Sequence, residues 1–277
     1  MPLELETFRQ EADARIAGNF HTGFLSLAEN LSTLARAGEE IGGFAINELN
    51  RIAQEPRAYS NTWEPNYLTL HRGREWTIRA GRYERTSSFI YSSPFHMLLC
   101  PITDCSLQVH HYELPDGVNL DVFDSKVRLK FKESRRYKRG EVIKVDGRLD
   151  AIDVTTDTSS MVLKLTSRHF VSQQWAFDRE CLLAQQAIAS EIVDSELVSL
   201  VGVLGAMQAY VSIDVLKKLT LHRRHFVRWS ALQSLARIST AEALPLVRDA
   251  LLDPHVHVRN AALKALSGVL EAEESRE

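Results

Sequence analysis

Cysteine is scarce in this sequence. Its 277 residues include three cysteines, Cys100, Cys105 and Cys181, and their spacing gives neither an even disulfide framework nor a C-x-x-C metal motif. A sparse, odd count is typical of a reducing compartment, so we predict a cytoplasmic protein with three buried thiols.

Long apolar runs and catalytic signatures are also lacking. The longest uncharged segment, 197–213, is short for a membrane span and contains glycine, serine and glutamine, so it predicts a buried helix. The N-terminal segment, 1–20, lacks the basic and apolar regions of a secretory signal, so we expect no export and no membrane partner. No nucleophile elbow, phosphate-binding glycine loop, dinucleotide fingerprint or H-E-x-x-H motif occurs, which leaves hydrolase, kinase and dehydrogenase functions without support.

The periodicity of apolar residues divides the chain into three predicted domains. Residues 1–58 have helical spacing, whereas residues 59–170 alternate with a period of two and predict ten short strands. Helical spacing returns over residues 171–277, beginning with a predicted helix at 173–193. The expected fold class is therefore α+β, with N-terminal helices, an antiparallel β-sandwich or barrel, and a C-terminal helical domain.

Two segments in the C-terminal domain repeat each other, and their alignment matches Val227-Arg228 to Val258-Arg259. The second copy reads D-P-x-x-x-V-R-x-A-A and resembles a HEAT repeat, and the first resembles a degenerate one. This resemblance implies a surface that binds a protein partner, and two arginines, Arg228 and Arg259, that bind a neighbouring aspartate and brace the stack. It also implies two helix pairs, 213–221 with 227–238 and 244–252 with 256–270.

Residues 98–167 resemble a cupin, in which one segment carries two histidines and a glutamate and a second segment carries another histidine. Pro115-Asp116-Gly117 resembles the turn before the first segment, and 140–147 resembles the glycine-led turn that opens the second. Residues 120–125 and Asp150 occupy the positions of the family's histidines. Because a mononuclear iron or zinc site normally needs imidazole ligands, we predict a cupin-like barrel without standard metal ligands and without a cofactor.

His111 and Glu113 form an alternative metal constellation. Residues two apart on a strand share one face, so this pair could hold Fe, Mn or Zn together with Asp121, His96 or His169. Adjacent histidines on a half-buried strand more often satisfy local hydrogen bonds, and we favour that interpretation because a metal-ligand spacing is missing.

Two basic strips are candidate binding surfaces. Residues 126–139 include eight basic residues and one acidic residue, a pattern typical of a protected edge strand and also of a phosphate-binding surface. We expect Val127, Leu129 and Phe131 to point inward and Tyr137 to be available for stacking. The second strip covers residues 217–237. The candidate contacts on the two strips are Lys130, Arg135, Arg136, Lys217, Lys218, Arg223, Arg224 and Trp229.

Three functions follow from these patterns. We favour a non-catalytic interaction or ligand-sensing protein, in which the HEAT-like surface binds a protein and the β barrel has room for a small molecule. The first alternative is a metal-dependent cupin-type oxygenase or isomerase that uses His111 and Glu113. The second is a nucleic-acid-binding protein that uses the basic strips 126–139 and 217–237.

Overall fold

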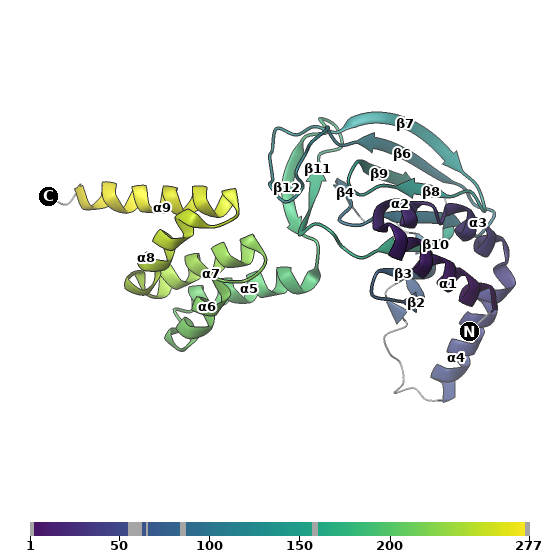
Figure 1. The fold of residues 1–277 in the computed structure, drawn as a ribbon, viewed down its shortest axis with the longest axis horizontal. Helices are drawn as coiled ribbons and strands as arrows, with labels where there is room; N and C mark the ends of the chain where they lie inside the picture. Colours follow the sequence, from purple (N-terminus) through teal and green to yellow (C-terminus); the bar gives the residue numbers. More distant parts are fainter. Residues whose placement is uncertain (1–2, 55–62, 65, 84–86, 157–159, 275–277) are drawn as a thin grey trace. The chain divides into compact units, whose positions relative to one another are not determined.

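The computed structural model describes residues 3–54, 63–64, 66–83, 87–156 and 160–274. The chain forms two compact units, residues 1–187 and 188–277, which are drawn in Figure 1. The first unit contains helices and two β-sheets, and the second contains helices. This arrangement confirms the predicted α+β fold class.

The β part of the first unit is a sandwich of two six-stranded antiparallel sheets. The first sheet has the strand order β1 (Trp63–Glu64), β2 (Tyr67–Arg72), β3 (Trp76–Tyr83), β10 (Ser160–Ser167), β5 (Met97–Pro101) and β8 (Ile143–Val145). The second has the order β12 (Ala184–Ala189), β11 (Gln173–Phe177), β4 (Ile90–Ser92), β9 (Asp150–Thr155), β6 (Leu107–Glu113) and β7 (Lys130–Tyr137).

Alternation along the strands builds two separate cores on the first sheet. Leu99 on β5 and Val162 on β10 pack with Val109 of the second sheet, so they lie between the sheets. Their strand neighbours Leu98 and Leu163 point to the opposite face and pack with the N-terminal helices. The first sheet is therefore buried on both faces, which explains why every residue of β5, Met97–Pro101, is buried.

Four helices cover the outer face of the first sheet: α1 (Leu3–Gly18), α2 (Phe20–Leu25), α3 (Ala28–Arg36) and α4 (Gly38–Gln54). The indole Nε1 of Trp76 on β3 donates a 2.8 Å hydrogen bond to Asp13 on α1. At Gly23 a Cβ atom would lie 2.1 Å from the carbonyl oxygen of Arg15, so the close packing of α2 on α1 requires glycine. The predicted N-terminal helices thus belong to the same compact unit as the sheets.

The helix predicted over residues 173–193 is wrong. This segment forms β11 and β12, and Trp175 and Phe177, two residues apart, both point into the core of the second sheet. The apolar residues that gave the helical spacing lie on both sides of a turn between the two strands. In this turn Leu182 has a φ of 59°, which a helix does not allow. The β part therefore continues past the predicted limit at residue 170, and the first helix of the second unit begins at Ile192.

Two strand predictions near the second sheet also differ from the structure. Residues 118–123 form turns, because the Asn119 side chain and carbonyl accept hydrogen bonds from the backbone of Asp121 and Val122. Leu129 is buried as predicted, but Phe131 is 51% exposed. A register shift between His111 and Tyr112 in the β6–β7 pairing changes which β7 side chains face inward.

None of the three cysteines, all of which are described, forms a disulfide. Cys100 on β5 is buried as predicted, and its burial raises the pKa of the thiol to about 11. Cys105 and Cys181 are half-buried, because each lies in a connection between strands. The prediction of a buried thiol therefore holds for Cys100 and is wrong for the other two.

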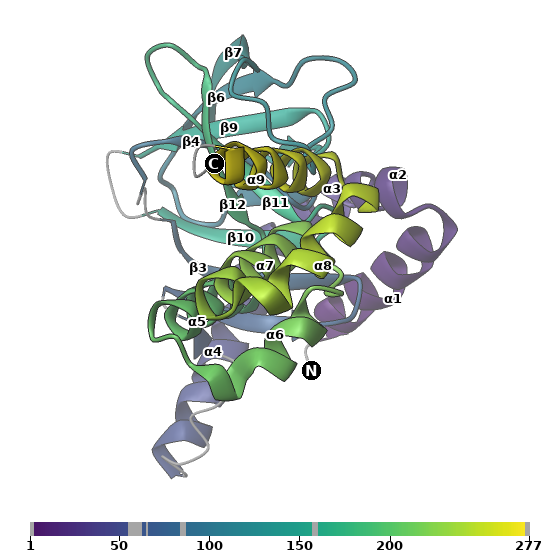
Figure 2. The same ribbon diagram turned by 90° about the vertical axis from the view of Figure 1, so that its left-hand side faces the viewer.

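The second unit consists of α5 (Ile192–Ala206), a short 3₁₀ turn η2 (Tyr210–Ser212), α6 (Ile213–Leu219), α7 (His225–Ile238), α8 (Thr240–Asp249), a second 3₁₀ turn η3 (Ala250–Leu252) and α9 (Val256–Glu274). Figure 2 shows these helices from a second direction. The two predicted helix pairs correspond to α6–α7 and α8–α9. None of the helices in the described part of the chain has both the length and the apolar character needed to cross a bilayer.

Candidate functional site

His111 lies between the two sheets, where it is buried. Its Nε2 atom is 3.2 Å from the hydroxyl oxygen of Tyr137 on the neighbouring strand β7. Burial lowers the pKa of His111, so its ring favours the neutral form. This contact agrees with a histidine that satisfies a local hydrogen bond.

The other two predicted metal ligands have different partners. Glu113 forms a 2.9 Å ion pair with the ammonium group of Lys132. Asp121 accepts hydrogen bonds from the backbone nitrogen and the hydroxyl of Ser172, at 2.8 and 2.5 Å. Across the described ranges, no three His, Cys, Asp or Glu side chains are grouped so that they could hold a metal ion.

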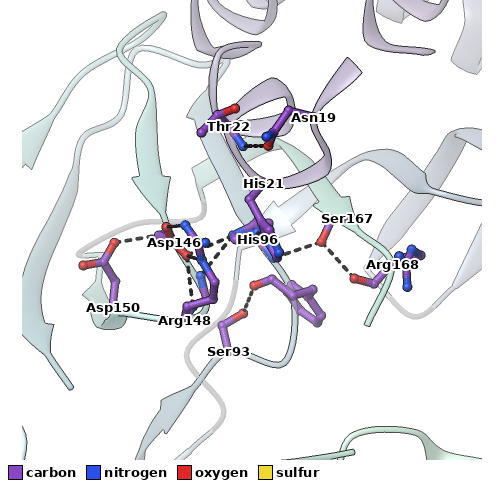
Figure 3. Close-up of polar contacts among 12 residues, drawn as sticks. Asn19, His21, Thr22, Ser93, His96, Asp146, Arg148, Asp150, Ser167 and Arg168 are labelled. Carbon is purple, nitrogen blue, oxygen red and sulfur yellow. Dashed lines mark hydrogen bonds and ion pairs between the residues drawn. The ribbon is translucent and has the colours of Figure 1, made fainter. Parts of the chain in front are cut away.

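A pair of histidines lies on the outer face of the first sheet, where α2 meets it (Figure 3). His96, just before β5, has no exposed surface, and its Nε2 atom is 2.6 Å from Nδ1 of His21 on α2. Phe20, Phe24 and Phe170 surround the His96 ring, with centroid separations of 5.9, 5.9 and 4.7 Å. One ring must donate and the other must accept, so this contact requires at least one neutral imidazole.

A turn with two charged residues, Asp146 and Arg148, lies next to this histidine pair. The Nδ1 atom of His96 is 3.2 Å from Oδ1 of Asp146, and the guanidinium of Arg148 binds the other carboxylate oxygen, Oδ2, at 2.6 Å. Burial alone would raise the pKa of Asp146, but the hydrogen bonds from Arg148 lower it overall. For His96 burial dominates, and the pKa falls to about 4. The ring is therefore neutral at physiological pH although a carboxylate lies next to it.

Sequence reasoning missed this histidine pair. His21 and His96 are 75 positions apart, and neither lies in a motif that predicts the other. The resemblance to a cupin directed attention to residues 98–167. Proximity of α2 to the turn at Asp146 depends on how the helices pack on the sheet, which no local pattern gives.

The space between the sheets includes a cavity of about 270 Å³. Tyr83, Tyr91 and Phe95 line it together with Lys164, whose ammonium group lies 5.7 Å from the ring centre of Tyr67. The cavity also borders Asp153, which forms an ion pair with Arg179. Its volume lies just below the range of about 300 to 1,000 Å³ that is usual for pockets that bind small molecules.

The first basic strip follows the edge strand β7, which pairs with β6 and ends the strand order of its sheet. Lys130, Arg135 and Arg136 are exposed, and Arg135 also contacts Glu141 at 3.3 Å. Tyr137 is buried, so the prediction that it is available for stacking is wrong. Charged side chains along an edge strand oppose pairing with another chain.

The second basic strip is largely used in contacts within the second unit. Lys217 forms a 2.6 Å ion pair with Glu242, and Arg224 binds both Asp194 and Glu191 at 2.8 Å. Trp229 packs against the apolar cluster of α7, α8 and α9. The two predicted contacts that remain exposed are Lys218 and Arg223.

Arg228 and Arg259 take the bracing positions implied by the resemblance to HEAT repeats. Arg228 binds both carboxylate oxygens of Asp253, at 2.5 and 2.7 Å, and Arg259 donates to the Asp253 carbonyl oxygen at 2.7 Å. Burial alone would raise the pKa of Asp253, but the hydrogen bonds from Arg228 and from the His255 backbone lower it overall. The turn before α9 is thus held by both repeats.

The first helix of this unit, α5, has a mostly apolar outer face on which Glu196 and Ser199 are also exposed. Its inner face packs on α7, where a Cβ atom at Gly205 would be 2.7 Å from that of Ser234. On the outer face, Ile192, Leu200 and Met207 are 75%, 62% and 71% exposed, and their spacing places them on one side of the helix. The helix predicted to be buried over 197–213 is therefore buried on one side only. In the pairs α6–α7 and α8–α9, the first helix packs beside the second. The element that precedes α5 in the chain is instead the strand β12.

Comparisons with solved structures give weak likenesses. A hydroquinone 1,2-dioxygenase from Sphingomonas sp. TTNP3, solved with 4-hydroxybenzoate, is 14% identical over 42% of this chain and 71% of its own, with a TM-score of 0.29. The hydroquinone 1,2-dioxygenase PnpCD, solved with Cd²⁺ and 4-hydroxybenzonitrile, is 14% identical over 40% of this chain and 68% of its own, with a TM-score of 0.29. Protein NMB1881 from Neisseria meningitidis is 10% identical over 42% of this chain and 96% of its own, with a TM-score of 0.24. TM-scores this low carry no argument about fold or activity.

The sequence comparisons concern the second unit. A search of curated proteins found no match. The family model described as HEAT repeats matches residues 188–267, which include α5 to α8 and most of α9. HEAT arrays generally form surfaces for protein interaction. The C-terminal helical part of this chain is therefore similar to a short HEAT-repeat array.

Proposed function

We propose that this protein is a non-catalytic interaction protein whose HEAT-like unit binds a protein partner through the outer face of α5. The observation that carries this proposal is the group of exposed apolar side chains on α5 and at its C-terminal cap, Ile192, Leu200 and Met207, which surround one exposed carboxylate, that of Glu196. A helix with one apolar face normally buries that face against another element. In the following pairs, α6 packs beside α7 and α8 packs beside α9. An amphipathic helix of the partner would pack beside α5 in the same way and complete the array.

Charge beside the apolar face supports an acidic partner. Arg223, in the turn before α7, contacts Glu191 next to the start of α5 at 3.7 Å and keeps a side chain that is 67% exposed, and Lys218 on α6 is also exposed. An apolar centre with a charged rim is the usual anatomy of a protein interface. We therefore expect acidic side chains at the edge of the partner's apolar stripe.

A capture experiment tests this proposal. Tagged full-length protein is purified from its native cells, and the bound proteins are quantified by mass spectrometry for wild type and for the Leu200→Glu/Met207→Glu variant. Both residues are exposed, so the variant keeps its fold, but two buried charges would remove the partner and reduce its recovery at least about tenfold.

Leu263→Glu is the matched control, because Leu263 on α9 is equally exposed and lies at the other end of the array. The control retains the partner. Loss of the same partner from both variants, or its retention by both, would contradict the proposed surface. Circular dichroism spectra of all three proteins check that the helices are intact.

For the β part we propose a cupin-like, ligand-binding sandwich that needs no metal. The contacts of His111 with Tyr137, Glu113 with Lys132 and Asp121 with Ser172 support this proposal, because each predicted ligand has another role. We expect purified protein to contain far less than one equivalent of Fe, Mn or Zn by elemental analysis. A stoichiometric content that the His111→Ala variant lost would favour the metal-dependent alternative.

A nucleic-acid partner has less support than a protein partner. Ion pairs with acidic side chains use Lys217 and Arg224, and charge on the edge strand β7 has a role in preventing strand pairing. A nucleic-acid complex would weaken steeply with rising salt concentration, whereas an apolar interface on α5 would not.

A further inference from the structure

A large cavity lies between α4 and the first sheet, away from the interior of the sandwich. Its volume is about 1140 Å³, which is enough for a ligand larger than most metabolites. Leu68 and Ala80 from the sheet and Ile41 from α4 form apolar parts of its wall, and Ile102 and Met161 extend them. The cavity belongs to the first unit and is independent of the surface on α5.

Small residues on α4 leave this space open. Gly38, Gly42 and Ala45 line the cavity together with Ile41, and their spacing of three or four places them on one face of the helix. A Cβ atom built at Gly42 would have no other atom within 4 Å. The helix therefore covers the sheet here without filling the space beneath it.

Guanidinium groups gather at one end of the cavity. Arg36, at the end of α3, lies against Gly140, since its Nε atom would be 2.9 Å from a Cβ atom there. The Nη2 atom of Arg139 would be 3.7 Å from a Cβ atom at Gly38. Both arginines line the cavity, as does Arg82 from β3. Among the described residues of the lining, these three cations outnumber the one carboxylate, that of Glu4.

Arg36, at the end of α3, and Arg139, just after β7, are available to a ligand. The partner of Arg139 is Asp104, at 3.6 Å, and the Asp104 side chain is itself 93% exposed, so this pair is weak. Among the described residues, Arg36 has no hydrogen-bond or ion-pair partner. Two guanidinium groups beside an apolar space present charge that a planar anion satisfies with paired hydrogen bonds.

We infer that this cavity binds an amphipathic carboxylate, with its head group on Arg36 and Arg139 and its apolar chain between α4 and the first sheet. Apolar walls exclude a wholly hydrophilic anion from most of the space, because its polar groups would lose water without replacement. Clustered guanidinium groups exclude a cationic head group. A fatty acid has the required combination of an apolar body and a small anionic end.

Titration calorimetry of the full-length protein with dodecanoate and with dodecanol, both below their aggregation limits, tests the head-group assignment. We expect dodecanoate to bind at one site and Arg36→Met to weaken it at least about tenfold, which is the usual value of a charge-assisted hydrogen bond. Arg36→Met should change dodecanol binding less than about twofold, because methionine keeps the apolar length of the side chain. Arg136→Met on the exposed edge strand is the control and should change neither.

A pair of glycine substitutions tests the location. Gly42→Leu would place an apolar side chain in the open space and abolish binding of both ligands, whereas Gly43→Leu makes the same change at the next position, which does not line the cavity. Leucine favours a helix at either position, so loss of folding is not expected. Absence of dodecanoate binding, equal binding of the two ligands, or equal effects of the two substitutions would overturn the inference. None of these results would affect the proposed partner surface on α5.

Discussion

Arg228→Met is expected to lower the free energy of unfolding of the HEAT-like unit by about 3 kcal/mol. The side chains of Arg228 and Asp253 are 11% and 9% exposed, so removal of the guanidinium leaves an uncompensated carboxylate in a largely buried position. The same change also removes the donor for the carbonyl oxygens of His222 and Arg223, at 2.9 and 3.3 Å. Methionine retains the apolar contacts of the side chain, so the effect reports the lost polar contacts.

Urea unfolding of the full-length protein, followed by the helical signal in circular dichroism, measures this change. Arg237→Met is the control, because Arg237 is exposed on the same helix α7, and we expect it to cost less than about 0.5 kcal/mol. Adding Asp253→Asn to Arg228→Met should recover part of the loss, since the buried charge is then gone. An effect below about 1 kcal/mol for Arg228→Met would mean that the pair does not brace the two repeats.

Acidification from pH 7 to pH 4 is expected to lower the stability of the first unit by about 3 kcal/mol through His96. Its pKa in the folded protein is about 4, against an ordinary value of 6.5, so the unfolded chain binds this proton more readily. The stabilisation is complete above about pH 6.5 and declines as the pH falls towards 4. Desolvation of the imidazole is the main cause, and protonation of both His21 and His96 would also put two N–H donors face to face.

The difference in unfolding free energy between wild type and His96→Gln, measured at several pH values, isolates this effect. Glutamine does not titrate, so we expect the difference to shrink as the pH falls from 6.5 to 4. His110→Gln on β6 is the control and should leave the wild-type pH profile unchanged. A difference that is constant over this range would show that protonation of His96 is not linked to unfolding.

The HEAT-like array could be predicted because the residues that define it lie within one repeat or in two neighbouring repeats of the sequence. An internal repeat aligned Arg228 with Arg259, and the bracing contact with Asp253 joins neighbouring repeats. Most strands of the sandwich could be predicted for the same reason, from the alternation of apolar and polar residues within each short segment of 59–170. Each strand needed only its own alternation and a turn at either end.

Features that depend on packing could not be predicted in this way. Trp175 and Leu182, seven residues apart, fit one stripe of a helix, and the pairing of β11 with β4 selects the strand for residues 173–177. Contact between His21 and His96 depends on where α2 packs against the sheet. The cavity beneath α4 depends on Gly38 and Gly42 facing a sheet whose strands come later in the sequence.

Trp76 gives the first unit an intrinsic optical reporter. Its indole is buried, packs edge-to-face on Phe8 of α1 with ring centres 5.8 Å apart, and donates to Asp13. Separation of α1 from the sheet would expose this ring to water and shift its fluorescence to longer wavelength. Trp175 is buried in the other sheet, so its emission would stay unchanged until the sandwich itself opened. In a variant with Trp63 and Trp229 replaced by phenylalanine, the two events could be followed by fluorescence.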